Sequence, residues 1–325
     1  MLTAPVLGRG DELAAILDCW DALPTRPPTW TGPRVAVIQG EAGLGKTTLV
    51  GSVINALNSQ PHRVLNGHCR LHSPAPYDWL ATILCAHPQA ALSVPDDARA
   101  WLSQDPDVPA DRYTPAALLR LAERAVRELV DRGPALVIAE DLHALDPASL
   151  SLLTELVSGP ALPALLLVTT RPASESVAPD LAARTLARLS SAPDSLRLGL
   201  KPLATGDIRA LLTAAYRQSI DERLAESVRQ RIGGNPYHLG ELLASGPVDP
   251  VRLVEAPSLT VRETQVLACL AEGWSNKQVA RALGISIRTV AVHVSNLLRK
   301  TGSASRTEAA LWAVSHRRLA PSRVG

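Results

Sequence analysis

One nine-residue stretch, Gly40 to Thr48, constrains the fold of this 325-residue chain more than any other. Its sequence, Gly-Glu-Ala-Gly-Leu-Gly-Lys-Thr-Thr, fits the pattern G-x-x-x-x-G-K-[ST]. Residues 34–38 before it are a short apolar and β-branched run that predicts a buried strand, and residues 47–57 after it predict a helix. Glycines allow consecutive backbone N–H groups to converge on an anion, and a helix start adds its positive dipole end. Strand, loop and helix together therefore predict a phosphate-binding loop.

The loop supplies the first set of candidate nucleotide ligands. Lys46 brings a full positive charge to the β- and γ-phosphates, and the Thr47 hydroxyl is placed to ligate Mg²⁺. The alternative, a glycine-rich turn that binds nothing, does not account for the strand before the loop or for the Lys-Thr pair. A nucleoside triphosphate or diphosphate with Mg²⁺ is therefore the expected cofactor. The candidate residues are Gly40, Glu41, Ala42, Gly43, Leu44, Gly45, Lys46, Thr47 and Thr48.

Two further predicted strands end in residues suited to a magnesium nucleotide. Residues 134–139 are an apolar run that leads into Glu140 and Asp141, and such carboxylates can face a metal or polarise an attacking water. The sequence leaves open which of the two acids faces the metal. Residues 164–170 form another buried run, followed at once by Arg171, which can reach a γ-phosphate. The catalytic candidates are therefore Lys46, Glu140, Asp141 and Arg171, and the candidate metal ligands are Thr47, Glu140 and Asp141.

Strands that alternate with helices predict an α/β fold, a three-layer parallel sheet with its ligands at the carboxyl edge. Weaker strands are expected near residues 63–66 and 196–200, the second after a Pro/Ser/Asp loop. From residue 205 the pattern becomes helical, which predicts a small lid across the nucleotide. The predicted domains are a phosphate-loop ATPase core at residues 1–203, a helical lid at 204–245, a Pro-rich linker at 246–257 and a small all-α four-helix domain at 258–325, here called the tail domain.

The tail domain differs from the rest of the chain in charge. It has ten Lys and Arg against three Asp and Glu, whereas the remainder has 23 against 28. A basic domain on an acidic body suggests a polyanionic partner. Two of its predicted helices are joined by a tight turn at Gly284, and the later one, residues 287–300, has the position of the helix that enters a DNA major groove. Double-stranded DNA is therefore the expected partner.

The candidate DNA-binding residues lie on or next to this later helix. Lys277, Arg299 and Lys300 are expected to contact phosphates, which fix the register of a protein on DNA without reading its sequence. The others are on the side expected to face the groove. The full set is Lys277, Arg288, Thr289, Ala291, Val292, His293, Ser295, Asn296, Arg299 and Lys300.

Residues 259–314 resemble the LuxR/NarL-type DNA-binding domain, and the front of the chain resembles the ATP-dependent LuxR regulators, a branch of the STAND signal-transducing ATPases. The resemblance implies that Gly8, Arg9 and Pro236 flank the adenine and that a Thr-Thr-Arg segment senses the phosphate. Family members usually have a long helical-repeat region between lid and DNA-binding domain, and here only the linker stands in that place. The residues that carry the front resemblance are Leu7-Gly8-Arg9, the Gly40 loop, Glu140-Asp141-Leu142-His143, Thr169-Thr170-Arg171 and Gly233-Gly234-Asn235-Pro236.

The predicted function is a transcription regulator in which ATP, in place of ADP, promotes self-association and binding to promoter DNA. One alternative is an ATPase whose slow hydrolysis is the output, with the tail domain used for anchoring or dimerisation. Another is a DNA-binding protein whose nucleotide is only structural. No signal peptide or membrane-spanning run is expected, and four cysteines without metal-ligand spacing fit free thiols in the cytoplasm.

Overall fold

The chain folds into two compact units. One comprises the residues up to Leu203 together with Asn235–His238, and the other comprises Ala204–Gly234 and the residues from Leu239 onward. Leu7 and the predicted linker at 246–257 lie outside the described residues. The computed structural model describes residues 8–23, 32–69, 75–105, 107, 112–130, 133–160, 162–172, 176, 178–244, 259–301, 303 and 305–315.

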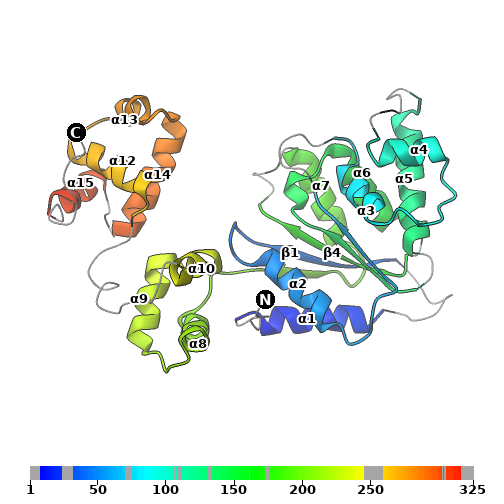
Figure 1. Ribbon diagram of the computed structural model, residues 1–325, viewed down its shortest axis with the longest axis horizontal. Helices are drawn as coiled ribbons and strands as arrows, with labels where there is room; N and C mark the ends of the chain where they lie inside the picture. The colour runs from blue at the N-terminus through cyan, green and yellow to red at the C-terminus, as the bar shows by residue number, and fades with distance from the viewer. Residues whose placement is uncertain are drawn as a thin grey trace. The chain divides into compact units, whose positions relative to one another are not determined.

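A parallel sheet forms the centre of the first unit, and its strand order is β2-β3-β4-β1-β5 (Figure 1). β1 pairs with β4 from Arg34 opposite Leu165 to Gln39 opposite Thr170, so the carboxyl ends of these two strands are level. The predicted α/β fold with its parallel sheet is confirmed. The strands are β1 (Arg34–Gln39), β2 (Arg63–Gly67), β3 (Ala135–Ala139), β4 (Ala164–Thr170) and β5 (Leu196–Gly199).

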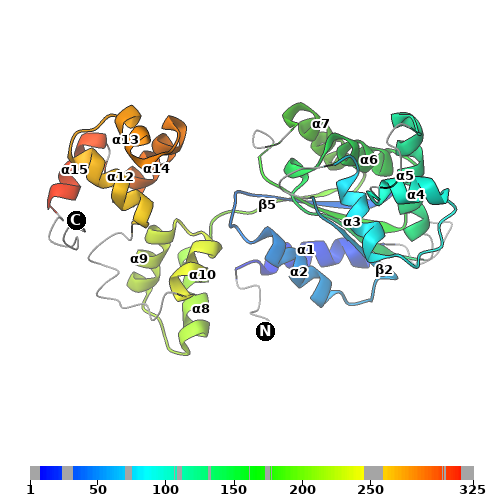
Figure 2. The same cartoon turned by 45° about the horizontal axis from the view of Figure 1, so that its top comes forward.

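Helices cover both faces of this sheet (Figure 2). On one face Ile38, Ile138 and Leu167 are buried in a core with α1 and α2. On the other face the alternate residues, such as Val37 and Val137, are buried against α3, α5, α6 and α7, as a strand period of two requires. The helices are α1 (Gly10–Asp21), α2 (Lys46–Ala56), α3 (Asp78–Ala86), α4 (Asp96–Leu102), α5 (Pro115–Val130), α6 (Pro147–Ser158) and α7 (Pro179–Ser190).

The helix α7 is an element that the sequence patterns do not predict, because they indicate only a Pro/Ser/Asp loop before the strand β5. Ala182, Thr185 and Leu189 of this helix are buried on one side, at spacings of three and four residues. Two parallel strands of one sheet need a crossover that lies on a sheet face, and a helix is the usual crossover. The segment contains many charged and small residues, so its overall composition does not indicate a helix with an apolar side.

Three helices follow the sheet. α8 (Thr205–Tyr216) packs against α9 (Glu222–Ile232), and α10 (Pro236–Ala244) begins after a turn at Gly233–Asn235. The turn contains two glycines with positive φ, 63° at Gly233 and 67° at Gly234, a backbone conformation that favours glycine. Asn235–His238, which include the first residues of α10, belong to the unit that contains the sheet.

The described part of the tail domain consists of α12 (Val261–Ala271), α13 (Asn276–Leu283), α14 (Ile287–Thr301) and α15 (Arg306–Ser315). Their apolar faces enclose a common core that includes Val266, Leu270 and Val290. Gly284, with φ of 65°, ends α13, and α14 starts three residues later. This is the tight turn that the sequence predicts between two helices. None of the helices described in either unit is long and apolar enough to cross a bilayer.

Candidate nucleotide site and nucleic-acid interface

The Gly40–Thr48 loop joins β1 to α2 and opens on a pocket of about 340 Å³. Gly43 and Gly45 adopt φ values of 78° and 87°, which other residues rarely adopt. Six residues of this loop line the pocket, and the other lining residues follow β3, follow β4 or begin α10. The lining residues are Ala42, Gly43, Gly45, Lys46, Thr47, Thr48, Asp141, Arg171, Pro236 and Tyr237.

The carbonyl groups of residues 40–44 in the loop all accept hydrogen bonds. The Lys46 ammonium donates to the carbonyl oxygens of Gly40 and Glu41 at 2.8 and 2.9 Å. The next carbonyl, of Ala42, accepts from Nδ2 of Asn235 at 3.0 Å. Gly43 O accepts from the Tyr237 N–H at 3.2 Å, and Leu44 O accepts from Nη2 of Arg9 at 3.3 Å.

This row of bonds sets the direction of the loop's N–H groups. In a planar trans peptide the C=O and the following N–H point in opposite directions. Fixing the carbonyls of residues 40–44 therefore also fixes the N–H groups of residues 41–45. Consecutive N–H groups held in this way form the concave anion-binding arrangement of a phosphate loop, and the start of α2 at Lys46 adds its dipole.

Asp141 is brought to the pocket by an unusual backbone conformation. Its φ of 53° and ψ of 52° are left-handed, and its N–H donates to Oγ1 of the buried Thr169 at 2.9 Å. Nδ1 of the buried His143 accepts from the Arg171 N–H at 3.4 Å and lies 3.9 Å from Oδ1 of Asp141. The ends of β3 and β4 are thus joined beside the pocket. A left-handed non-glycine residue at such a place is a reason to suspect a functional site.

Other predicted nucleotide ligands lie outside the pocket lining. Glu140 does not line it, although Asp141 does. Arg9 is buried, and besides Leu44 O its guanidinium donates to Lys201 O at 2.5 Å. Gly8 precedes it in a turn. The Arg9 guanidinium therefore joins the loop to the segment after β5. The family resemblance implies a different place for Arg9, beside the adenine.

Tyr237 lines the pocket, and Asn235 and His143 contact the lining residues Ala42 and Arg171, but the sequence patterns do not single out any of the three. All three fall within or next to segments that carry the family resemblance, and that is the only sequence signal for them. Asn235 and Ala42 are 193 positions apart, so no local pattern could predict their contact.

The face of the tail domain that is predicted to contact DNA lies on α14. Arg288, Thr289, Ala291 and Ser295 are exposed there, and Val292 leaves 54% of its surface uncovered. Lys277 and Arg299 are exposed as well, whereas His293 and Asn296 are half-buried. Val290 and Leu297 on the opposite side are buried in the core. Most of the predicted DNA-binding residues are therefore on one accessible side of the helix-turn-helix.

Some basic residues of the tail domain hold the fold together. Nη2 of Arg262 donates to Leu283 O at 2.8 Å and so caps the end of α13. Nη1 of Arg306 donates to Oδ1 of Asn276 at 2.8 Å, and its Nη2 donates to Trp274 O. These two residues contribute to the basic count from which a polyanion is predicted, but their guanidinium groups are used inside the domain.

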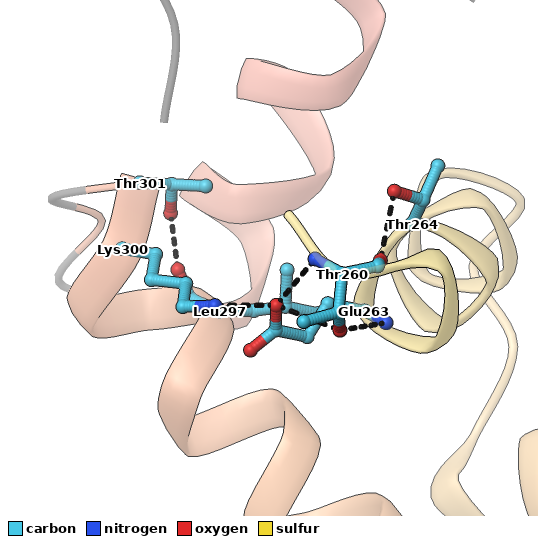
Figure 3. Close-up of polar contacts among 6 residues, drawn as sticks. All are labelled: Thr260, Glu263, Thr264, Leu297, Lys300 and Thr301. Carbon is cyan, nitrogen blue, oxygen red and sulfur yellow. Dashed lines mark hydrogen bonds and ion pairs between the residues drawn. The ribbon is translucent and has the colours of Figure 1, made fainter. Parts of the chain in front are cut away.

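Lys300 is placed inward as well. Its Nζ lies 2.6 Å from Oε2 of Glu263, and the exposed fractions of the two side chains are only 18% and 5% (Figure 3). The same carboxylate accepts from the N–H and the hydroxyl of Thr260 in the capping box that opens α12. Lys300 thus joins the end of α14 to the start of α12, whereas the sequence predicts a phosphate contact.

The charge of Glu263 depends on these partners. Burial favours the neutral acid, but the hydrogen bonds from Lys300 and Thr260 outweigh burial and hold the pKa of Glu263 below its usual value. A carboxyl group with a lowered folded-state pKa stabilises the fold at neutral pH. That contribution is lost as the pH falls from about 4.3 through the lowered pKa.

Lys300→Met is expected to lower the unfolding free energy of the tail domain at pH 7 by about 2 kcal/mol, because it leaves the buried Glu263 carboxylate without its cation. Hydrogen exchange of α12 and α14 peptides in the full chain measures the loss. At pH 3.5 the difference from the wild type should shrink. Arg299→Met, at the exposed neighbouring position, is the control, and an equal loss there would contradict the role of Lys300.

Two family models match the chain. Residues 5–168, about half of the chain, match the AAA ATPase domain, and residues 257–313 match the bacterial regulatory proteins of the luxR family. These matches confirm the ATPase domain and the LuxR-type domain that the motifs predict. Membership of the STAND branch stays a prediction.

Similar proteins share mainly the second of these domains. The uncharacterized transcriptional regulatory protein YhcZ of Bacillus subtilis is 57% identical over 58 residues, which cover 18% of this chain and 27% of that protein. The response regulator protein VraR of Staphylococcus aureus is 45% identical over 58 residues, with 18% and 28% covered. The chain thus spans little more than a quarter of the length of these relatives.

Among solved structures, Cdc6p from Pyrobaculum aerophilum aligns over 92% of this chain and 89% of that one, with 12% identity and a TM-score of 0.48. The assignment of the chain rests on the family matches and on the phosphate loop, the parallel sheet and the helix-turn-helix described above. The chain belongs to the family of proteins with an AAA ATPase domain, joined here to a helix-turn-helix domain of the bacterial luxR-family regulatory proteins.

Proposed function

We propose that this chain is an ATP-binding transcription regulator whose helix-turn-helix binds promoter DNA, and that ATP in place of ADP promotes DNA binding or self-association. An AAA ATPase domain joined to a luxR-family regulatory domain supports a transcriptional regulator. The observation that supports nucleotide binding is the loop at residues 40–48, whose carbonyls accept hydrogen bonds from Lys46 and Asn235 and which lines a pocket together with Asp141 and Arg171.

The residues around the pocket fit a magnesium nucleotide. The loop N–H groups and Lys46 would hold the phosphates, and Arg171 would face the terminal phosphate. Within the described residues no cluster of three or more His, Cys, Asp or Glu could hold a metal by itself. That suits Mg²⁺, which usually takes one or two protein oxygens together with phosphate oxygens. We assign these oxygens to Thr47 and Asp141, because both line the pocket and Glu140 does not.

The exposed side of α14 fits the major groove of DNA. Lys277, Arg288 and Arg299 are exposed cations around it and suit phosphate contacts. Val292 and Ala291 offer apolar surface, which recognises the methyl group of thymine. Lys300 is left out of this assignment, because its ammonium contacts Glu263.

The switch requires that ATP and ADP differ in affinity for two states of the protein. Self-association in the ATP state would bring several tail domains to adjacent half-sites, and multivalency would then convert weak single contacts into occupancy. Such a protein would act in the cytoplasm, where promoter DNA and nucleotides are available.

DNA titrations of the full chain test this switch. A duplex selected from a random library by the protein itself serves as the probe, and its affinity is compared with MgADP and with a non-hydrolysable ATP analogue. The analogue is expected to raise the affinity by about fivefold or more, the usual size of a coupling between two sites, and to increase the molar mass measured by light scattering. Equal affinity together with equal mass in the two nucleotides would refute the switch.

A further inference from the structure

The turn before α10 contacts the phosphate-binding loop through one side chain and one backbone group. Nδ2 of Asn235 donates to Ala42 O at 3.0 Å, and the N–H of Tyr237 donates to Gly43 O at 3.2 Å. Oδ1 of Asn235 also accepts from the Tyr237 N–H at 2.9 Å, the contact that a capping side chain makes at a helix start. Asn235 therefore uses its acceptor to begin α10 and its donor to hold the loop.

The contact is close enough to restrict the loop sequence. A Cβ atom at Gly43 would lie 2.6 Å from Oδ1 and 2.8 Å from Nδ2 of Asn235, and 3.0 Å from Cβ of Tyr237. Real side chains do not approach one another so closely. Gly43 is therefore required here for two reasons, its positive φ and the amide group of Asn235 that packs against it.

The consequence concerns the two peptide groups at the centre of the loop. The Ala42 carbonyl belongs to the same peptide plane as the Gly43 N–H, and the two point in opposite directions. By holding the carbonyl, Asn235 directs the Gly43 N–H away from itself, and Tyr237 does the same for the next N–H. These are N–H groups that a phosphate would need.

We infer that Asn235 is a positioning residue for phosphate binding, which holds the Ala42–Gly43 peptide in the orientation that an anion requires. This inference rests on the proposed nucleotide site. It gives the Gly-Asn-Pro turn a role at the phosphates, in addition to the place beside adenine that the family resemblance implies. Asn235 acts through the loop and does not contact the ligand in this role.

Substitutions at Asn235 separate the loop contact from the helix cap. Asn235→Ser and Asn235→Asp keep an oxygen that can cap α10, but the serine hydroxyl ends one bond nearer the backbone and the carboxylate cannot donate. Calorimetry on the full chain measures the Kd of each variant for MgADP and for inorganic pyrophosphate. The Kd for each ligand is expected to rise about fivefold in Asn235→Ser for one lost hydrogen bond. In Asn235→Asp it should rise about thirtyfold, because a negative charge is added beside the phosphates.

Asn58→Ser removes an amide that donates to Oδ2 of Asp21 at 2.8 Å in the same unit, outside the pocket lining, and should change neither Kd. The melting temperature of the nucleotide-free Ser and Asp variants should stay within about 2 °C of the wild type, because the cap survives.

A cap-only role would leave Asn235→Ser at the wild-type Kd and weaken Asn235→Ala, and the loss in Asn235→Asp would then report only its added charge. A base contact would weaken MgADP binding and spare pyrophosphate. Either result would overturn the inference. Wild-type protein that binds neither ligand would refute the nucleotide site and this role together, whereas wild-type binding with an unchanged Kd in Asn235→Ser would refute only the role of Asn235.

Discussion

Lys46→Met is expected to weaken MgADP binding by the full chain about a hundredfold. Lys46 begins α2 with only 7% of its surface exposed, and its ammonium donates to Gly40 O and Glu41 O inside the loop. Truncating one partner of a buried, hydrogen-bonded charge pair costs about 2–5 kcal/mol, and each 1.4 kcal/mol is about tenfold in Kd. Methionine keeps an apolar side chain of similar length, so the loss reports mainly the missing charge.

Calorimetry of MgADP binding measures this effect, and Lys201→Met is the matched control. Lys201 is an exposed lysine of the same unit and does not line the pocket, so the Kd of Lys201→Met for MgADP should equal that of the wild type. Lys46→Met leaves the carbonyls of Gly40 and Glu41 without their donor and should lower the melting temperature by a few degrees, whereas Lys201→Met should melt near the wild-type temperature. A Kd for Lys46→Met within about threefold of the wild type would show that the loop does not bind phosphate.

The fold was largely predictable because its signals are local. A strand, a glycine-rich loop and a helix start occupy adjacent positions at residues 34–57, and each is set by its own residues. The capping box of Thr260 and Glu263 is equally local, because its two residues are three positions apart in the sequence. α7 was missed because the need for it comes from the sheet: β4 and β5 are parallel strands on either side of β1, and a crossover must join them.

The site was predictable only in part, because its distinguishing contacts join distant residues. Glu140 and Asp141 look alike in sequence. The turn that carries Asp141 to the pocket depends on the hydroxyl of Thr169, 28 positions away on the neighbouring strand. Lys300 likewise counts as one more cation, until the fold brings it to Glu263, 37 positions earlier. Charge totals show how many basic groups a domain has and not which of them face outward.

Asp146 gives rise to the largest expected effect on stability. Only 2% of its surface is exposed, and it caps α6 through the N–H groups of Ala148 and Ser149 at 2.9 Å each. It also accepts from the N–H groups of Tyr77 and Asp78 at 3.1 and 3.2 Å, at the start of α3. One carboxylate thus faces the positive dipole ends of two helices that are 69 positions apart in the sequence.

Asp146 and three of the residues that donate to it, Tyr77, Asp78 and Ser149, are buried. Burial, together with the charge of Asp146, raises the pKa of Tyr77 to about 12. Burial also raises the pKa of the nearby Cys69 thiol to about 12, with further contributions from Asp78 and Asp146. Backbone donors in such an interior need a protein partner, because each one left without an acceptor costs about 1–3 kcal/mol.

Asp146→Ala is therefore expected to lower the unfolding free energy of the sheet-containing unit by about 4 kcal/mol, near the upper end for a single substitution. Asp146→Asn, which keeps one acceptor oxygen, should lose about half as much. Because the chain has more than one compact unit, the loss is measured by hydrogen exchange of α3 and α6 peptides in urea. Asp221→Ala is the control: this exposed cap of α9 accepts from a single N–H, that of Arg223, and its removal should cost only about 1 kcal/mol. If Asp146→Ala cost no more than Asp221→Ala, a carboxylate shared by two helices would be worth no more than an ordinary surface cap, and α3 and α6 would have to be held together by their apolar contacts alone.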